Sequence, residues 1–360
     1  METGISVYPG LGQSNKDILA LMEKAADLGI RRLFTSLHIP ETDTASFRQQ
    51  LDLILASARN AHFDVIADVS PSTCQLLGLA QADVEKLSAL GITTLRFDEG
   101  LDAAHLALYS QVVRVQINAS TVQEKELQEL QKNKADFSHI DGLHNFYPRP
   151  HTGLDEAYFT AQTKLLHAYG LSVGAFLPSQ TGKRAPLYEG LPTLEAHRHA
   201  DVSLAARHLS ALGVQSIFLG DDRPSLKELT ALARAGREET GVVVLKARLL
   251  SKEAYIQDLL SYTFTTRPDP SRDVIRTSGS RSHLRGRIIE PDSNLFRSLQ
   301  RGDITLDNAD FLRYMGEVQI VKRDLPPEER TNIVAKIVPN EEFLLAYLTP
   351  GRKFRFEFIR

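Results

Sequence analysis

The feature that most constrains the fold is a unit repeated through the first 240 residues: an apolar segment, a polar stretch and an amphipathic helix. In the first copy, an apolar segment at 5–8 ends at Pro9-Gly10. After Ser14, apolar residues recur at helical spacing up to Gly29. Eight apolar segments are expected to be strands: 5–8, 31–41, 63–71, 93–100, 112–119, 137–143, 171–177 and 214–220.

Strands that alternate with helices predict a parallel sheet, because right-handed crossovers place consecutive strands side by side. Eight such units over about 240 residues fit a closed (β/α)8 TIM barrel. An open, doubly wound sheet is the main competitor, but it usually has fewer strands, and its GxGxxG turn is absent here. We therefore predict an α/β protein in which residues 1–240 form the barrel.

The pattern changes after Gly241, where short β segments separated by turn residues replace the helical periods. These segments are 242–250, 273–277, 303–307, 316–321, 331–338 and 354–359, and residues 252–260 have helical spacing. Residues 241–360 are therefore expected to form a small, mostly antiparallel β domain.

The segment 137–154, FSHIDGLHNFYPRPHTGL, places many polar groups at the end of the sixth predicted strand. His144, Asn145, Tyr147 and Arg149 follow its apolar part, and two prolines restrict the backbone between them. A surface loop without a binding role can also be polar. A rigid polar loop at the end of a buried strand nevertheless favours a binding role.

Barrel enzymes carry their sites at the carboxyl ends of the strands. Those ends supply further polar residues: His38, Glu41, Asp68, Asp98, Glu99, Asn118, Asp221 and Asp222. Acid/base cleavage of an acetal requires two carboxyl groups across a cleft. We expect Asp98 and Glu41 to be the catalytic pair, because alternate strands point into one mouth, with Glu99 and Asp221 as further catalytic candidates. Taken singly, a carboxylate is more often a helix cap or an ion-pair partner.

Two basic regions are candidates for holding an anion. The stretch 178–195 exceeds the usual βα-loop length, which favours a lid that brings Arg184 over a ligand; a disordered excursion is the alternative. Between Arg267 and Arg281 the chain is polar and basic, with Arg272 and Arg276 inside the segment. It either faces the barrel mouth and meets an anion or is a solvated linker, and both interpretations stay open.

Composition argues against several function classes. A formal net charge of -3 does not favour nucleic acid, and no apolar run approaches the roughly 20 residues of a membrane helix. The first residues lack signal-peptide features and Cys74 is the only cysteine, so we expect a cytoplasmic protein without an intrachain disulfide. HExxH, GxSxG and P-loop patterns are absent, and neither a metal nor a cofactor is expected.

Six segments carry a family likeness: GISVYPG, LFTSLHIPE, LRFDEG, HNFYPRPHTGL, RPDPSRDVIRTSGSR and GEVQIVKRDLP. In this order along nearly the whole chain, they resemble the MupG-type 6-phospho-N-acetylmuramidases, glycoside hydrolase family 170. The resemblance implies a barrel followed by a cyclophilin-like β domain. It also implies an intracellular enzyme of cell-wall recycling that hydrolyses the β-1,4 bond between N-acetylmuramic acid 6-phosphate and N-acetylglucosamine.

The implied substrate carries a phosphate and a lactyl carboxylate, so basic groups are expected beside the catalytic carboxylates. The candidates are Arg149, Arg184, Arg267 and Arg281. Sugar hydroxyls and the acetamide are expected to meet the other polar strand-end residues: His38, Asn118, His144, Asn145 and Tyr147. The acetamide also permits substrate-assisted cleavage, with Asp98 orienting it and Glu99 as the acid.

Two alternatives stay open. One is a barrel lyase or aldolase acting on a phosphorylated sugar, but no predicted strand end carries the lysine that a Schiff base needs. The other is a sugar-phosphate-binding protein without turnover. In each case the expected partner is a small molecule, and the protein is a monomer or a homodimer.

Overall fold

The computed structural model describes residues 1–360 except 38–43, 70–83, 98–101, 285, 293–295 and 360. The chain forms two compact units. One comprises Met1–Leu209 and Gly213–Glu238, and the other Ser210–Leu212 and Glu239–Arg360. No helix in the described part of the chain is both long and apolar enough to cross a membrane.

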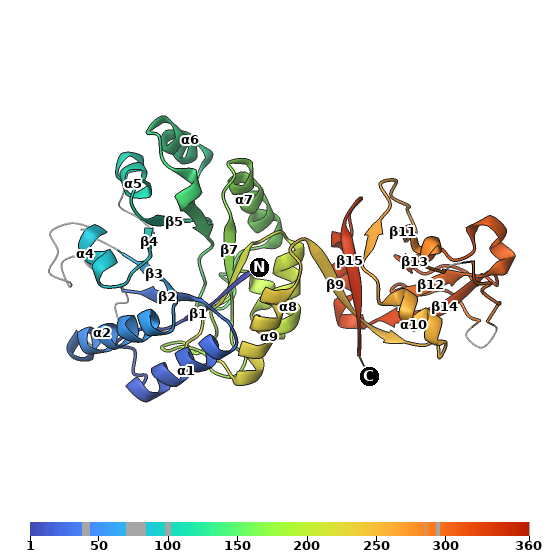
Figure 1. The fold of residues 1–360 in the computed structure, drawn as a ribbon, viewed down its shortest axis with the longest axis horizontal. Coiled ribbons are helices and arrows are strands. Elements are labelled where there is room, and N and C mark those ends of the chain that lie inside the picture. Colours follow the sequence, from blue (N-terminus) through green and yellow to red (C-terminus); the bar gives the residue numbers. More distant parts are fainter. Residues whose placement is uncertain (38–43, 70–83, 98–101, 285, 293–295, 360) are drawn as a thin grey trace. The chain divides into compact units, whose positions relative to one another are not determined.

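The first unit is a closed barrel of eight parallel strands, with helices on its outside (Figure 1). The strands are β1 (Glu2–Ser6), β2 (Arg32–Ser36), β3 (Asp64–Asp68), β4 (Thr94–Phe97), β5 (Arg114–Asn118), β6 (Ile140–Leu143), β7 (Val173–Leu177) and β8 (Ser216–Leu219). They follow one another in chain order, and β8 pairs with β1 to close the ring. The predicted TIM barrel is confirmed.

The helices of this unit follow the predicted strand–helix alternation. They are α1 (Asn15–Asp27), α2 (Thr44–Asn60), α4 (Val84–Ala89), α5 (Ala103–Ser110), α6 (Glu124–Lys132), α7 (Glu156–Ala168), α8 (Val202–Ala211) and α9 (Leu226–Arg237). Ser14 caps α1 by accepting the Asp17 N–H at 3.1 Å, as its sequence position predicts. Residue 137 was expected in the sixth strand but instead begins the 3-10 turn η1 (Phe137–His139), which Asp136 caps.

Close packing inside the barrel depends on a glycine at the β1–β8 junction. Gly4 pairs with Phe218, and a Cβ atom on Gly4 would lie 2.2 Å from Phe218 Cδ1. The absent side chain lets the Phe218 ring fill the interior. A buried apolar cluster joins this ring to residues of other strands and of the loops after β1 and β7: Tyr8, Phe34, Ile66, Leu143, Phe176 and Leu191. The barrel is therefore a packed core and not a pore.

The second unit is a closed barrel of seven strands in the order β10-β11-β13-β12-β14-β9-β15 (Figure 1). The strands are β9 (Val242–Leu249), β10 (Phe264–Thr266), β11 (Val274–Ser278), β12 (Asp303–Asp307), β13 (Val318–Val321), β14 (Thr331–Ile337) and β15 (Lys353–Ile359). All neighbours are antiparallel except β9 and β15. The six predicted β segments are confirmed, and the short strand β10 was not predicted.

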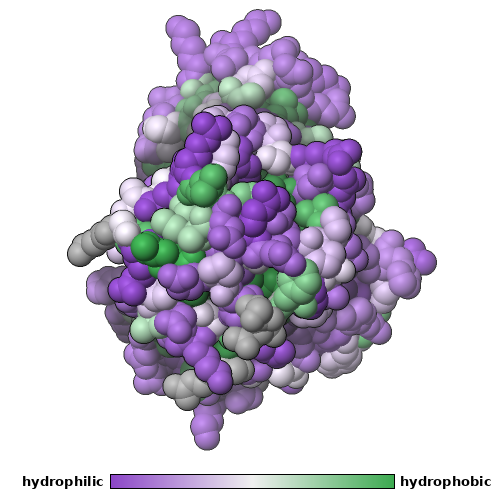
Figure 2. Space-filling model, turned by 90° about the vertical axis from the view of Figure 1, so that its right-hand side faces the viewer, coloured by the Kyte–Doolittle hydropathy of each residue, from purple (hydrophilic) through white to green (hydrophobic). Residues whose placement is uncertain are grey.

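Helical segments in the second unit are short. They are α10 (Ala254–Leu260), η3 (Ser280–Leu284), η5 (Ala309–Tyr314) and η6 (Pro339–Tyr347). The face shown in Figure 2 is mainly hydrophilic, with separate hydrophobic patches. Single exposed apolar side chains such as Ile288 and Leu312 are normal on a protein surface.

Candidate active site

The carboxyl ends of the barrel strands are the place where sequence analysis expects the active site. Four predicted residues, His38, Glu41, Asp98 and Glu99, lie outside the described residues. The described candidates of this unit lie at the ends of β5 and β6, in the loop after β7 and directly after β8.

Arg184 lies in the loop between β7 and the 3-10 turn η2 (Glu195–His197), and its guanidinium packs on aromatic rings. Arg184 Cζ is 4.5 Å from the ring centre of Tyr8 and 5.2 Å from that of Phe146. Its Nε donates a 3.2 Å hydrogen bond to the carbonyl of Ala185, and its Nη1 is buried without a partner. A positive charge is therefore held over an apolar, aromatic floor, where cation–π attraction fixes its position.

Tyr8 connects the first and last strands of the barrel beneath this guanidinium. Its hydroxyl donates a 2.7 Å hydrogen bond to the carbonyl of Gly220. Burial raises the pKa of the Tyr8 phenol above its ordinary value, so the ring stays neutral. The prediction singled out polar strand ends and missed this residue, although an aromatic residue before Pro9-Gly10 was a visible signal.

Asp221, a predicted catalytic candidate, is fully buried after β8 and holds the loop that follows β7. Its Oδ1 accepts the Arg184 N–H at 2.8 Å, while its Oδ2 accepts those of Ser179 at 2.8 Å and Leu191 at 3.3 Å. Burial raises the pKa of the Asp221 carboxyl to about 6 against the opposing effect of these amides. Because both oxygens are engaged, its contacts are those of a loop anchor and not of an acid that reaches a ligand.

Asp222, the next residue, differs from Asp221 in its hydrogen bonding. Its backbone carbonyl accepts a 2.6 Å hydrogen bond from Gln13 Nε2, but its buried side-chain Oδ1 has no partner within the part of the chain that the structure describes. Burial raises the pKa of the Asp222 carboxyl, and the charges of Arg223 and Arg184 oppose that effect. An unpaired buried carboxylate oxygen is costly, so it is a natural acceptor for a ligand.

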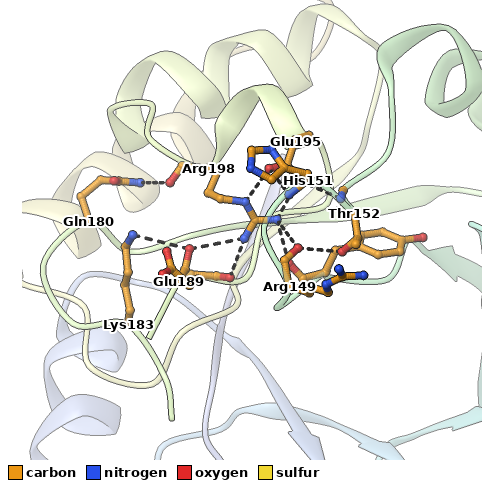
Figure 3. A network of polar contacts seen from close by, with 11 residues as sticks. Arg149, His151, Thr152, Gln180, Lys183, Glu189, Glu195 and Arg198 are labelled. Atoms are coloured by element: carbon orange, nitrogen blue, oxygen red, sulfur yellow. Dashed lines mark hydrogen bonds and ion pairs between the residues drawn. The ribbon is translucent and has the colours of Figure 1, made fainter. Parts of the chain in front are cut away.

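An ion pair between the buried Arg198 and the half-buried Glu195 joins the long loops after β6 and β7 (Figure 3). Arg198 Nε and Nη2 bind the two carboxylate oxygens of Glu195 at 2.6 and 2.7 Å. Its Nη1 donates to the carbonyls of Glu189 and Gly190, and its Nη2 to those of Tyr147 and Arg149, at 3.0 to 3.3 Å. One guanidinium therefore fixes the backbone of both loops.

Glu195, the ion-pair partner of Arg198, also binds the backbone of the loop after β6. Glu195 accepts the backbone N–H groups of His151 at 2.9 Å and Gly153 at 2.8 Å. Its hydrogen bond from Arg198, together with these amides, lowers the pKa of Glu195 to about 2. The i, i+3 spacing of Glu195 and Arg198 was a signal for an ion pair, but nothing in the sequence connects this pair to the loop after β6.

The loop 178–195, predicted to be a lid, is anchored at its two ends. Besides the Asp221 contacts, Glu228 of α9 accepts the Gln180 N–H at 2.6 Å and the Ser179 hydroxyl at 3.0 Å. The exposed part is the tip, where Leu187 and Tyr188 are 49% and 60% exposed. The disordered alternative does not fit these contacts. Any lid movement would concern the tip.

His144, predicted to bind the substrate, faces the helical layer. Its Nδ1 lies 3.2 Å from Ser120 Oγ, its Nε2 lies 3.1 Å from Thr163 Oγ1 of α7, and its ring packs on Phe159. Burial, with a smaller effect of Arg96, lowers the pKa of His144 to about 3. The imidazole is fully buried and both nitrogens have partners, so its contacts are structural and do not fit the predicted role.

Asn118 and Asn145 accept hydrogen bonds through their side chains at the ends of β5 and β6. Asn118 Oδ1 accepts the Ser120 N–H at 2.9 Å. Asn145 Oδ1 accepts a hydrogen bond from Arg96 Nη2, and Arg96 Nη1 donates to the carbonyl of Leu143 at 2.9 Å. Arg96 was not predicted, although a charged residue within an apolar strand segment was a signal.

Tyr147 and Arg149 lie on the part of the β6 loop that Arg198 holds through their carbonyls. Figure 3 shows Arg149 beside Arg198. Tyr147 N–H donates to the carbonyl of Pro192 at 2.9 Å, so the loops after β6 and β7 also join directly. The Tyr147 side chain is half-buried and that of Arg149 is exposed. Their predicted contact with a substrate stays a prediction.

Arg267 and Arg281 belong to the second unit and have partners within it. Arg267 Nε binds Asp269 Oδ1 at 2.9 Å, and Arg281 Nη1 donates to the carbonyl of Arg313 at 2.6 Å. Both side chains lie on the surface of this unit. Their predicted contact with the ligand of the barrel stays a prediction.

The described residues contain no group of three or more His, Cys, Asp or Glu side chains arranged to hold a metal ion. Among the described residues, the buried polar atoms without a hydrogen-bond partner include Arg184 Nη1, Asp222 Oδ1 and the amide oxygen of Gln13. Such atoms suit hydrogen bonding to an organic, oxygen-rich ligand.

A closed parallel barrel with polar residues at its carboxyl ends, followed by a β barrel, defines a two-unit protein of the TIM-barrel enzyme class. Comparison with protein families specifies the class. Residues 3–234 match the model described as 6-phospho-N-acetylmuramidase, N-terminal, and residues 243–357 match its C-terminal counterpart. The chain belongs to the 6-phospho-N-acetylmuramidase family and is a glycosidase.

Two solved structures are similar over the whole chain. An uncharacterized B. cereus protein is 26% identical, with a TM-score of 0.84 and 99% of each chain covered. A conserved Enterococcus faecalis protein of unknown function is 32% identical, with a TM-score of 0.67 and coverage of 99% of this chain and 96% of that one. No curated protein matches the sequence significantly.

Proposed function

We propose that this glycosidase hydrolyses the β-1,4 bond between N-acetylmuramic acid 6-phosphate and N-acetylglucosamine. The observation that carries the proposal is the match of both units to one activity, 6-phospho-N-acetylmuramidase. The barrel mouth supports it, because Arg184 there offers a buried unpaired donor to an anionic ligand. Such a disaccharide is a fragment of peptidoglycan, so we place the reaction in cell-wall recycling in the cytoplasm.

The catalytic step in this proposal uses carboxyl groups that follow β2 and β4 in the sequence. Asp98 and Glu41 are the proposed pair: one protonates the leaving oxygen, and the other attacks, activates water or stabilises positive charge at the anomeric carbon. The alternative is substrate-assisted, with Asp98 orienting the acetamide and Glu99 as the acid. Asp221 does not carry this role in the proposal, because backbone amides engage both of its oxygens.

Binding of the sugar is assigned to strand ends on the β5–β6 side. Asn145 and Tyr147 are partly exposed there on a loop that Arg96 and Arg198 hold in place. We propose that they contact hydroxyl groups or the acetamide, with Asn118 beside them. His38 remains a proposed contact on sequence position alone.

We propose that residues 1–240 form the catalytic domain and that residues 241–360 form a cyclophilin-like domain. The closed seven-stranded β barrel of the second unit supports the second assignment. A homodimer is also proposed. Light scattering coupled to gel filtration tests it, and a mass near the 40.1 kDa of one chain would contradict it.

The experiment for the function is incubation of the purified protein with the phosphorylated disaccharide, followed by measurement of free N-acetylglucosamine. We expect time-dependent release, and a loss of at least about 10²-fold in kcat for Asp98→Asn. Near-normal turnover by that variant would remove Asp98 from the mechanism. Binding without release by the unaltered protein would contradict the proposed reaction.

A further inference from the structure

Arg184 has a guanidinium nitrogen for which the described residues provide no partner. The residue is 8% exposed, and Nη1 is buried without a hydrogen bond, while Nε is satisfied by Ala185. Leaving a donor of a charged group buried and unpaired costs more than leaving a neutral one unpaired. Such an atom at the carboxyl ends of barrel strands points to a bound acceptor.

The position of this guanidinium is fixed before any ligand arrives. Asp221 Oδ1 accepts the backbone N–H of Arg184, and the rings of Tyr8 and Phe146 lie 4.5 and 5.2 Å from its Cζ atom. The apolar rings leave little competing water on that face. A charged donor in such surroundings attracts an anion more strongly than a solvated one does.

Two other arginines near the carboxyl ends, Arg198 and Arg96, are engaged by the protein. All three nitrogens of Arg198 donate to Glu195 or to backbone carbonyls, and Arg96 holds Leu143 and Asn145. Arg32 also has an unpaired buried nitrogen, but it begins β2 at the amino end of the strand, and it binds Glu2 and Asp141.

A second unpaired atom lies on the residue next to Asp221, whose Oδ1 accepts the Arg184 N–H at 2.8 Å. Asp222 Oδ1 is buried and has no hydrogen-bond partner among the described residues. One free donor and one free acceptor suit a ligand that presents an anionic oxygen and a hydroxyl group. A phosphorylated sugar has both.

We propose that Arg184 binds the phosphate of the substrate, and that Asp222 accepts a hydrogen bond from a hydroxyl group of the same sugar. This inference rests on the proposed function for the identity of the sugar. It assigns phosphate selectivity to the loop after β7 and not to Arg149, Arg267 or Arg281.

The test is calorimetric binding of N-acetylglucosamine 6-phosphate, N-acetylmuramic acid and N-acetylglucosamine to the full chain. Arg184→Lys should weaken binding of the 6-phosphate at least tenfold and leave the two unphosphorylated sugars unchanged, because lysine lacks the planar fork of arginine. The matched control is Arg114→Lys at the exposed amino end of β5, which should change none of the three. Arg184→Gln, which removes the charge, should weaken binding of the 6-phosphate further.

The variant Asp222→Ala tests hydroxyl binding by Asp222 separately from phosphate binding by Arg184. It should weaken binding of the phosphorylated and unphosphorylated forms of N-acetylglucosamine by the same factor, because the hydroxyl is common to both. Tighter binding of the 6-phosphate by this variant would overturn the role of Asp222. Thermal unfolding of each variant near that of the unaltered protein establishes that folding is retained.

The assignment of Arg184 is overturned if both of its variants bind the 6-phosphate normally. It is also overturned if they lose N-acetylmuramic acid alone, since Arg184 would then read the lactyl carboxylate. Binding does not require cleavage. A protein that binds the 6-phosphate through Arg184 but releases no N-acetylglucosamine would therefore contradict the proposed function alone.

Discussion

Two arginines of this chain, Arg198 in the first unit and Arg272 in the second, are held in opposite ways. In the first unit, the Arg198 side chain is 3% exposed, and it binds Glu195 and four backbone carbonyls. In the second unit, the Arg272 side chain is 79% exposed and pairs with the adjacent Asp273. A guanidinium can organise a site when buried carbonyls surround it, and it contributes little when water does.

The largest effect is expected from removing the buried guanidinium. Arg198→Met should lower the free energy of unfolding by about 3 kcal/mol, because Glu195 and the carbonyls after β6 and β7 would lose their donor. Urea unfolding at pH 7 measures the change. A loss below 1 kcal/mol would show that the loops hold together without this residue and would break the comparison.

A somewhat smaller loss is expected at Asp221. In Asp221→Asn, an amide group replaces one acceptor oxygen, so a donor meets the N–H of Arg184 or those of Ser179 and Leu191. The unsatisfied amides should cost about 2 kcal/mol. Urea unfolding gives the energy, and faster proteolytic cleavage within 178–195 is expected alongside it. Unchanged protection of this loop would contradict the anchoring role.

The contribution of Glu195 to the free energy of unfolding is expected to depend on pH. Its folded-state pKa of about 2 lies below the ordinary value of 4.5, so its stabilising effect is complete above about pH 5 and is lost as pH falls towards 2. Glu195→Gln should be about 2 kcal/mol less stable at pH 7 and nearly equal to the unaltered protein near pH 2. A difference that does not depend on pH would contradict the ion pair.

The contribution of Asp221 to the free energy of unfolding is expected to depend on pH in the opposite direction. Its folded-state pKa of about 6 lies above the ordinary 3.8, so the folded chain holds a proton that the unfolded chain has lost. The contribution of this group to stability should therefore decrease as pH rises from about 4 to 6. Comparing the unaltered protein with Asp221→Asn over that range isolates the effect from that of Glu195.

The smallest effect is expected in the second unit. Arg267 pairs with Asp269, whose side chain is 60% exposed, so Arg267→Ala should change the free energy of unfolding by less than about 0.5 kcal/mol. The measurement is again urea unfolding. A loss comparable to that of the Arg198 variant would show that the exposure of an arginine side chain does not determine how much it stabilises this protein.

The sequence was sufficient for the barrel because each strand and each helix carries its own periodic pattern. It also located the β segments of the second unit, except the three-residue strand β10, whose Phe264–Thr266 sequence is too short to show alternation. The family followed from ordered motifs. These features depend on residues that are close together in the sequence, so they can be recognised without the structure.

The candidate site was harder because its contacts join distant parts of the chain. Asp221 has the sequence context of a catalytic residue, and only the fold brings the amides of Ser179 and Leu191 to its oxygens. His144 follows a strand end like its neighbour Asn145, but the backbone turns its ring towards α7. Which side a residue faces after a strand ends is not fixed by the alternation within the strand.

The most direct test of the central claim is the ratio of kcat/KM for the 6-phosphorylated and unphosphorylated N-acetylmuramic acid–N-acetylglucosamine disaccharides. A glycosidase that reads phosphate at its barrel mouth should favour the phosphorylated form by about 10²-fold or more, equivalent to one charge-assisted contact of about 3 kcal/mol. Equal values for the two disaccharides would contradict the account.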